Sequence, residues 1–123
     1  MYATESSEMY LENILVLSQK QEVVRAIDIT RYSGYSKPSV SRAMGILKKQ
    51  GHILVNDDGH ITLTDSGRAI AEKILERHRI ITELLIGLGV SPDTAAKDAC
   101  KIEHDLSDET FDALKRHMSE SHN

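Results

Sequence analysis

The residues with the clearest chemical potential lie between positions 100 and 104. Cys100, Glu103 and His104 are spaced i, i+3 and i+4, so on a helix they would project from one face. A thiolate, a carboxylate and an imidazole are soft, hard and borderline donors for a first-row transition metal. The alternative is an ordinary amphipathic helix with one buried thiol, because free cysteine mostly behaves as a small hydrophobe. The spacing alone leaves both interpretations open.

The composition restricts the class of protein. A chain of 123 residues fits one domain or two small ones, and with one Phe and no Trp its core must be aliphatic. The single cysteine excludes an intrachain disulfide framework and suits a reducing compartment. No apolar run approaches the roughly 18 residues of a membrane span, and the first residues lack the basic and apolar regions of a leader peptide. We therefore expect a cytoplasmic protein that does not enter the membrane.

The charges are unevenly distributed along the chain. The net charge is −4, yet residues 25–49 carry six basic side chains against one acidic one, whereas residues 71–123 carry seven basic and eleven acidic. A basic segment on a mildly acidic chain is the pattern of a phosphate-binding surface. Surface helices are often rich in Lys and Arg, so the charge needs support from the order of the elements.

The first half of the sequence predicts helices over about 5–18, 26–33 and 36–50. Gly34 forms the turn between the second and third helices, Ser36 is an N-cap and Pro38 falls in the first turn. Two β-rich runs, 52–56 and 60–64, then flank an Asp-Gly turn, which is a strong hairpin signal. Helix, turn, helix and hairpin is the order of a winged helix-turn-helix, whose second helix enters the major groove. A generic small α+β domain is the alternative.

The second half predicts helices only. Asp65 or Ser66 is expected to cap a long helix that reaches about Leu88, Ser91 begins a helix containing residues 100–104, and residues 107–109 begin the last helix. Such a thin helical half buries its apolar faces poorly alone, so we expect a two-fold homodimer. The residues expected at this interface are apolar: Ile80, Leu84, Leu85 and Leu88. The fold class is thus mainly α, with a DNA-binding domain over 1–70 and a helical dimerisation and metal-binding domain over 71–123.

Five segments of the sequence resemble the diphtheria toxin repressor family of iron- and manganese-dependent regulators. They are residues 6–14, 36–41, 63–67, 77–79 and 98–107, and the resemblance they carry extends in order over nearly the whole chain. The resemblance implies a winged-helix domain, a helical metal-binding and dimerisation domain, and repression of metal-uptake genes from palindromic operators when metal is replete. The SH3-like third domain of longer family members has no counterpart in these 123 residues.

The resemblance also implies a set of metal ligands. Iron-type members use a methionine of the first helix with the Cys, Glu and His of the later motif, whereas manganese-type members have an aspartate and a glutamate in place of the Met and the Cys. The residues that match a ligand position of either branch are Met9, Glu12, His78, Cys100, Glu103 and His104. Fe(II) is therefore expected, with Mn(II) as the alternative and Co(II) or Ni(II) as in vitro surrogates. A second, ancillary site would need a carboxylate at Thr82 and a histidine at Ala96, and neither is present.

The expected partners are an operator duplex and a second copy of the chain, with no small-molecule substrate. The residues expected to face the major groove are Ser36, Lys37, Pro38, Ser39, Ser41 and Arg42, and Lys48 is expected to contact the DNA backbone.

Two other functions use the same residues. A small metalloenzyme would need an open metal position and a substrate pocket, and no nucleophile-elbow, P-loop or HExxH pattern is present. A winged-helix redox sensor would use Cys100 itself, although a single cysteine has no resolving partner. We therefore expect a metal-dependent regulator that is not an enzyme.

Overall fold

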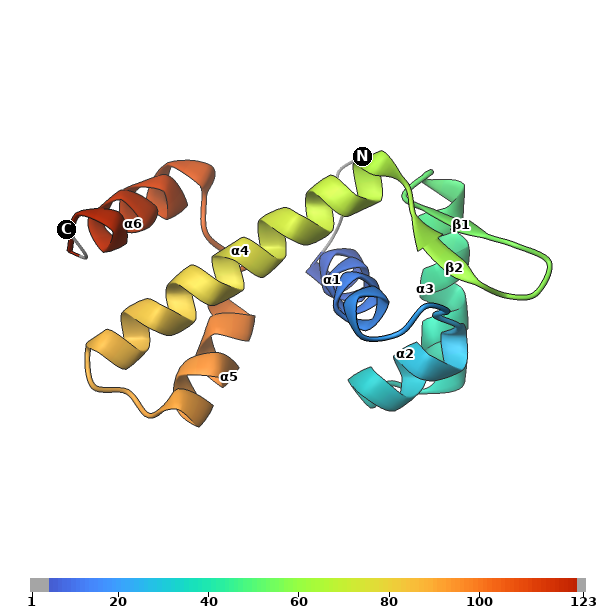
Figure 1. Ribbon diagram of the computed structural model, residues 1–123, viewed down its shortest axis with the longest axis horizontal. Coiled ribbons are helices and arrows are strands. Elements are labelled where there is room, and N and C mark those ends of the chain that lie inside the picture. Colours follow the sequence, from blue (N-terminus) through green and yellow to red (C-terminus); the bar gives the residue numbers. More distant parts are fainter. Residues whose placement is uncertain (1–4, 122–123) are drawn as a thin grey trace. The chain divides into compact units, whose positions relative to one another are not determined.

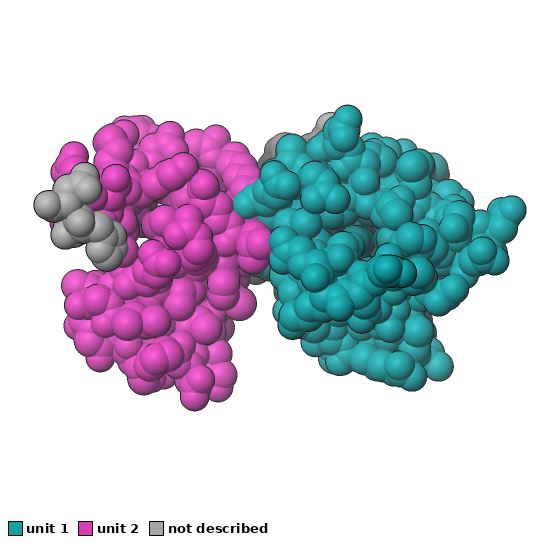
Figure 2. All heavy atoms as spheres, viewed as in Figure 1, with its two compact units in different colours: residues 1–72 teal, residues 73–123 magenta. Residues whose placement is uncertain are grey.

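Six helices and one β-hairpin follow one another in the computed structural model, which describes residues 5–121 (Figure 1). They fall into two units, residues 1–72 and residues 73–123 (Figure 2). No helix among the described residues is long and apolar enough to cross a membrane.

Three helices form the body of the first unit: α1 (Glu5–Lys20), α2 (Ala26–Ser33) and α3 (Lys37–Lys49). All three were predicted, and α1 extends two residues beyond the expected end. Each helix turns an aliphatic face inward, as the composition required. The fully buried aliphatic side chains of these helices are Leu11, Ile14, Ile29, Val40 and Leu47.

The turn between α2 and α3 follows the sequence prediction closely. Gly34 has a φ of 80° and donates its N–H to the Thr30 carbonyl, a left-handed conformation in which a side chain would be strained. The Ser36 hydroxyl then accepts a hydrogen bond from the Ser39 N–H at 3.3 Å, which makes Ser36 the N-cap of α3. Pro38 lies in the first turn, where an N–H is not needed.

The predicted hairpin consists of two short antiparallel strands, β1 (Ile53–Val55) and β2 (Ile61–Leu63). Ile53 pairs with Leu63 and Val55 with Ile61. Both strands bury their first isoleucine, and the Ile61 N–H also donates to the Val24 carbonyl at 2.8 Å, which ties the wing to the segment before α2. The order helix, turn, helix and wing confirms the winged helix-turn-helix.

The long helix α4 (Asp65–Gly87) begins differently from the prediction. The expected caps, Asp65 and Ser66, were wrong: the Thr64 hydroxyl accepts the Gly67 N–H at 3.2 Å, so Thr64 is the N-cap. The same hydroxyl donates to the Gly51 carbonyl at 2.7 Å, and this anchor to the α3–β1 connection favours Thr64 over its neighbours. Gly67 lies so close to the backbone just before β1 that a Cβ there would overlap the His52 carbonyl.

The second unit consists of the remainder of α4 with α5 (Pro92–Ile102) and α6 (Asp108–Ser121). Ser91 caps α5, and the Ser107 hydroxyl accepts the Thr110 N–H at 3.1 Å at the start of α6, as predicted. The buried apolar side chains of this unit are Ile74, Ile80, Ile81, Ala95, Ala99 and Phe111. Ile80 was expected at a dimer interface, and this was wrong because its side chain is buried within its own chain.

Candidate functional site

Three candidate metal ligands converge in the second unit. His78 of α4 lies beside Cys100 of α5 and Glu103 at the end of α5, with the Nδ1 atom of His78 2.9 Å from the Glu103 Oε2 and 3.7 Å from the Cys100 Sγ. One donor atom from each residue falls within 4.8 Å of the others, and no other such group of three occurs among the side chains that the structure describes, those of residues 7–120. The sequence therefore identified a set of donors that the fold brings together.

These donors fit a first-row divalent ion. Metal–nitrogen, metal–oxygen and metal–sulfur bonds of roughly 2.0–2.3 Å place neighbouring ligand atoms about 3–4 Å apart, which is the range of the two distances above. The Glu103 carboxylate is 1% exposed, and a carboxylate that is so buried needs a positive charge or hydrogen-bond donors around it. Cys100 is exposed, so the group is reached from solvent.

His104 occupies a different position from the one that the spacing predicted. Helix α5 ends at Ile102, Glu103 is its C-cap, and the Asp105 N–H donates to the Ile102 carbonyl at 3.0 Å in the turn that follows. His104 therefore lies in the turn after α5 and not on the helix itself. Its Nε2 atom lies 3.4 Å from the Glu103 Oε1, so the buried carboxylate has an imidazole beside each oxygen.

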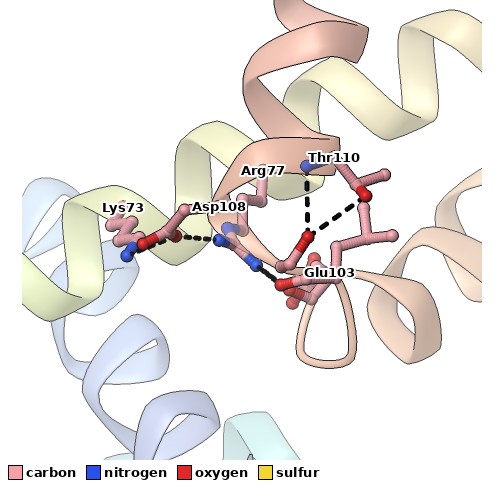
Figure 3. Close-up of polar contacts among 7 residues, drawn as sticks. Lys73, Arg77, Glu103, Asp108 and Thr110 are labelled. Carbon is pink, nitrogen blue, oxygen red and sulfur yellow. Dashed lines mark hydrogen bonds and ion pairs between the residues drawn. The ribbon is translucent and has the colours of Figure 1, made fainter.

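Arg77 holds the loop that carries two of these ligands (Figure 3). Its guanidinium is buried and donates to the carbonyls of Glu103 and Leu106, at 3.1 and 2.6 Å. It also pairs with the Asp108 carboxylate at the start of α6 and lies 5.2 Å from the centre of the Phe111 ring. One side chain of α4 thus fixes the backbone between α5 and α6, including the backbone of Glu103.

The charge at Asp108 is stabilised from two positions on α4. The Lys73 ammonium lies 2.8 Å from the Asp108 carboxylate, and this hydrogen bond and charge, together with Arg77, lower the pKa of that carboxyl from its usual value. No functional role was predicted for Lys73, Arg77 or Asp108. A signal was available for Arg77, since it falls one turn from Ile74 and from Ile81 on the apolar stripe of α4.

The two remaining candidate ligands lie in the first unit, on α1. The Sδ atom of Met9 accepts a hydrogen bond from the Tyr35 hydroxyl at 3.3 Å. The Tyr35 ring also contacts Tyr10, and burial and then Tyr35 raise the pKa of the Tyr10 hydroxyl. Glu12 is half-buried one turn after Met9. At the two positions that an ancillary site would need, the Thr82 hydroxyl donates to the His78 carbonyl at 2.6 Å, and the side chain of Ala96 is a methyl group.

The residues expected to contact DNA form an exposed face of α3 and of the turn before it. Val40, Met44 and Leu47 bury the opposite face of the helix. The exposed residues on the expected face are Ser36, Lys37, Pro38, Ser39, Ser41, Arg42 and Lys48. The Ser36 hydroxyl is engaged in the cap and in a 2.9 Å contact with the Ser39 hydroxyl, so the other members are more available to a ligand.

Two family models match this chain. The one described as "Iron dependent repressor, N-terminal DNA binding domain" matches residues 3–61. The one described as "Iron dependent repressor, metal binding and dimerisation domain" matches residues 64–122.

Individual relatives include manganese and iron regulators. The chain is 35% identical over 106 residues to the transcriptional regulator MntR of Escherichia coli O157:H7, covering 86% of this chain and 68% of MntR. It is 29% identical over 106 residues to the iron-dependent repressor IdeR of Mycobacterium tuberculosis, covering 85% of this chain and 46% of IdeR.

A solved structure of a manganese-dependent transcriptional repressor in complex with manganese is 29% identical, with a TM-score of 0.84 over 92% of this chain. This chain spans about half the length of that repressor, 52%. All of these relatives are transcriptional regulators, in agreement with the expectation of a regulator rather than an enzyme.

Proposed function

Because this chain belongs to the iron-dependent repressor family of metal-dependent transcriptional regulators, we propose that it represses transcription when a divalent metal is bound. The single observation that carries this proposal is that His78, Cys100 and the buried Glu103 each place one donor atom within 4.8 Å of the others. Its action belongs in the cytoplasm, where chromosomal DNA is present and a lone thiol stays reduced.

We propose six residues as metal ligands, two in the first unit and four in the second. They are Met9, Glu12, His78, Cys100, Glu103 and His104. A bound divalent ion supplies the positive charge that a thiolate beside a buried carboxylate requires. A bound ion would favour the DNA-competent state only as far as it is bound more tightly in that state. Arg77 supports this site by fixing the Glu103 backbone.

The DNA partner is proposed to be a palindromic operator read by the N-terminal part of α3. Exposed Lys37, Ser41 and Arg42 suit contacts to bases and phosphates, and Lys48 suits the backbone. A homodimer matches two half-sites that lie roughly 34 Å apart, one helical turn of DNA.

A surface of the second unit supports a dimer. At the end of α4, Ile86 is 42% and Leu88 is 72% exposed. Together with Leu84 and Met118 they line a hollow of about 450 Å³ between α4 and α6. We expect light scattering of the purified protein at micromolar concentration to give the mass of a dimer. A monomer with and without metal would contradict this assembly.

Fe(II) is the metal that we propose. Met9 and Cys100 offer a thioether and a thiolate, which are softer than the oxygen donors that Mn(II) prefers. Glu12, Glu103 and the two histidines suit either ion, so Mn(II) is the second candidate. Co(II) and Ni(II) should also activate in vitro, because the intrinsic affinity of such donors does not exclude them.

The test is operator binding under anaerobic conditions. A duplex is first selected from random-sequence DNA by the Co(II)-loaded protein, and its affinity is then measured against free Fe(II), Mn(II) and Co(II). We expect at least one of these ions to raise the affinity, and replacement of Cys100 with Ser to shift the response to higher metal concentration. DNA binding that responds to peroxide through Cys100 but to no metal would overturn the proposal in favour of a redox sensor.

A further inference from the structure

We infer that Tyr35 couples the metal ligand of α1 to the start of the recognition helix α3. The inference rests on the proposed function, because it takes Met9 as a ligand. Tyr35 neither binds the metal nor belongs to the residues proposed to contact DNA. Its side chain links the occupancy of the metal site to the position of the first turn of α3.

One end of this connection is a contact between Tyr35 and α1. The Tyr35 hydroxyl donates to the Met9 sulfur at 3.3 Å, and the Tyr35 ring centre lies 5.6 Å from that of Tyr10, with the ring planes tilted by 52°. A thioether sulfur has two lone pairs, so it can accept a hydrogen bond with one and bind a metal with the other. A sulfur atom held by a metal therefore also holds the Tyr35 hydroxyl.

The other end of the connection is the cap of α3. Tyr35 directly precedes Ser36, whose hydroxyl accepts the Ser39 N–H, and the Tyr35 N–H donates to the Ser33 hydroxyl at 3.2 Å. The position of Tyr35 therefore sets where the first turn of α3 begins. That turn is the part of a recognition helix that meets the bases.

The proposed ligand Met9, Tyr35 and the start of α3 also line one hollow. Met9 and Tyr35 line a hollow of about 340 Å³ in the first unit together with Ser39 and Arg42. The proposed ligand and two proposed DNA-contacting residues thus border one space. Tyr35 is 41% exposed there, so packing alone holds its ring loosely and the bond to Met9 contributes to its order. Ordering this side chain before DNA arrives lowers the cost of binding DNA.

The experiment compares Tyr35→Phe with a control, Tyr32→Phe. The control also removes a tyrosine hydroxyl, from an exposed residue of α2. Co(II) binding is followed by absorption. Affinity for the duplex selected by the Co(II)-loaded wild-type protein is followed by fluorescence anisotropy, without metal and with saturating Co(II). We expect the Co(II)-induced gain in DNA affinity to be roughly threefold to tenfold smaller in Tyr35→Phe than in the wild-type protein. This factor is the range of one hydrogen bond's net contribution. By reciprocity, the DNA-induced gain in Co(II) affinity should fall by the same factor. Tyr32→Phe should keep the full gain.

A full Co(II)-induced gain in Tyr35→Phe would overturn the inference, and so would an equal loss in Tyr32→Phe, which would indicate general damage to the α2–α3 region. A double-mutant cycle adds a second arm. In a Met9→Leu background the Tyr35→Phe change should have no further effect on the gain, and an additive loss would also overturn the inference. Failure of the proposed function looks different, because the wild-type protein itself would then show no Co(II)-dependent gain.

Discussion

At the residue scale, the guanidinium of Arg77 donates to two carbonyls of the α5–α6 loop, those of Glu103 and Leu106, and its central carbon lies 5.2 Å from the centre of the Phe111 ring. Arg77→Met keeps much of the volume but leaves both carbonyls without this charged donor. We expect the free energy of unfolding to fall by about 2 kcal/mol, since hydrogen bonds to charged groups are worth more than neutral ones. Urea denaturation followed by circular dichroism measures the change.

The matched control is Arg79→Met, two residues along the same helix. Arg79 is exposed and its contact with Glu83, at 3.5 Å, is an i,i+4 surface pair. Such pairs contribute little, so this variant should stay within about 0.5 kcal/mol of the wild-type protein. Equal losses in the two variants would show that Arg77 has no special role in the loop.

Arg42 is the residue of α3 whose substitution bears most directly on DNA recognition. It is exposed on the expected DNA-facing surface, and arginine is the side chain that most often pairs with guanine through two hydrogen bonds. Arg42→Ala should weaken operator binding by about 1–3 kcal/mol if that contact is bidentate, and should relax specificity at one base pair. Lys49→Ala, at the last turn of the same helix, should reduce affinity similarly for all sequences. Unchanged operator affinity in Arg42→Ala would remove Arg42 from the recognition set.

At the scale of elements, the junction between the wing and α4 depends on a glycine. A Cβ at Gly67 would overlap the backbone of His52, which cannot rotate away as a side chain could, so Gly67→Ala should cost roughly 1–3 kcal/mol of stability. Gly45→Ala is the opposite case, because Gly45 lies inside α3 with no atom within 4 Å of an added Cβ. That variant should gain about 0.5–1 kcal/mol through helix propensity. Thermal unfolding of both variants tests the pair, and two changes of the same sign would contradict it.

The elements that the sequence predicted well are those with a local chemical signal. Three helices begin after a serine whose hydroxyl accepts the backbone N–H three residues later: Ser36, Ser91 and Ser107. A serine at this position is a helix-start signal that the sequence alone provides. The Asp-Gly turn likewise marked the hairpin. Thr64 was missed as a cap because its preference comes from a bond to Gly51, thirteen positions away in the chain, and no local pattern reports such a contact.

The same distinction applies to the candidate site. The spacing identified Cys100 and Glu103 correctly as neighbours, since both stand within or at the end of α5. It did not predict the turn that carries His104, because the helix ends at Ile102, two residues before it. It also assigned nothing to Arg77, whose partners are carbonyls that only the packing of three helices brings within reach.

At the scale of the whole molecule, the proposed ligands come from both ends of the chain, with Met9 and Glu12 on α1 and the others on α4, α5 and the loop after it. Two of these positions distinguish iron from manganese, Met9 in the first unit and Cys100 in the second. Met9 contributes a thioether and Cys100 a thiolate, whereas Glu103 and His104 would serve iron or manganese equally. Metal choice is thus a property of the pair and is best altered at both positions together.

Replacing Met9 with Asp and Cys100 with Glu should shift the response from Fe(II) towards Mn(II), because both soft donors become the oxygen donors that Mn(II) prefers. The measurement is the ratio of operator affinities with the two ions under anaerobic conditions. The control pair, Met9→Leu with Cys100→Ser, removes the soft donors without adding carboxylates, and it should weaken the response to both ions instead of exchanging them. The hypothesis that these residues select iron would be contradicted if the wild-type protein bound its operator fully at low micromolar Mn(II) and showed no increase in operator affinity with Fe(II). In that case Glu12, Glu103 and the imidazoles would dominate the site, because they are the donors that already suit manganese.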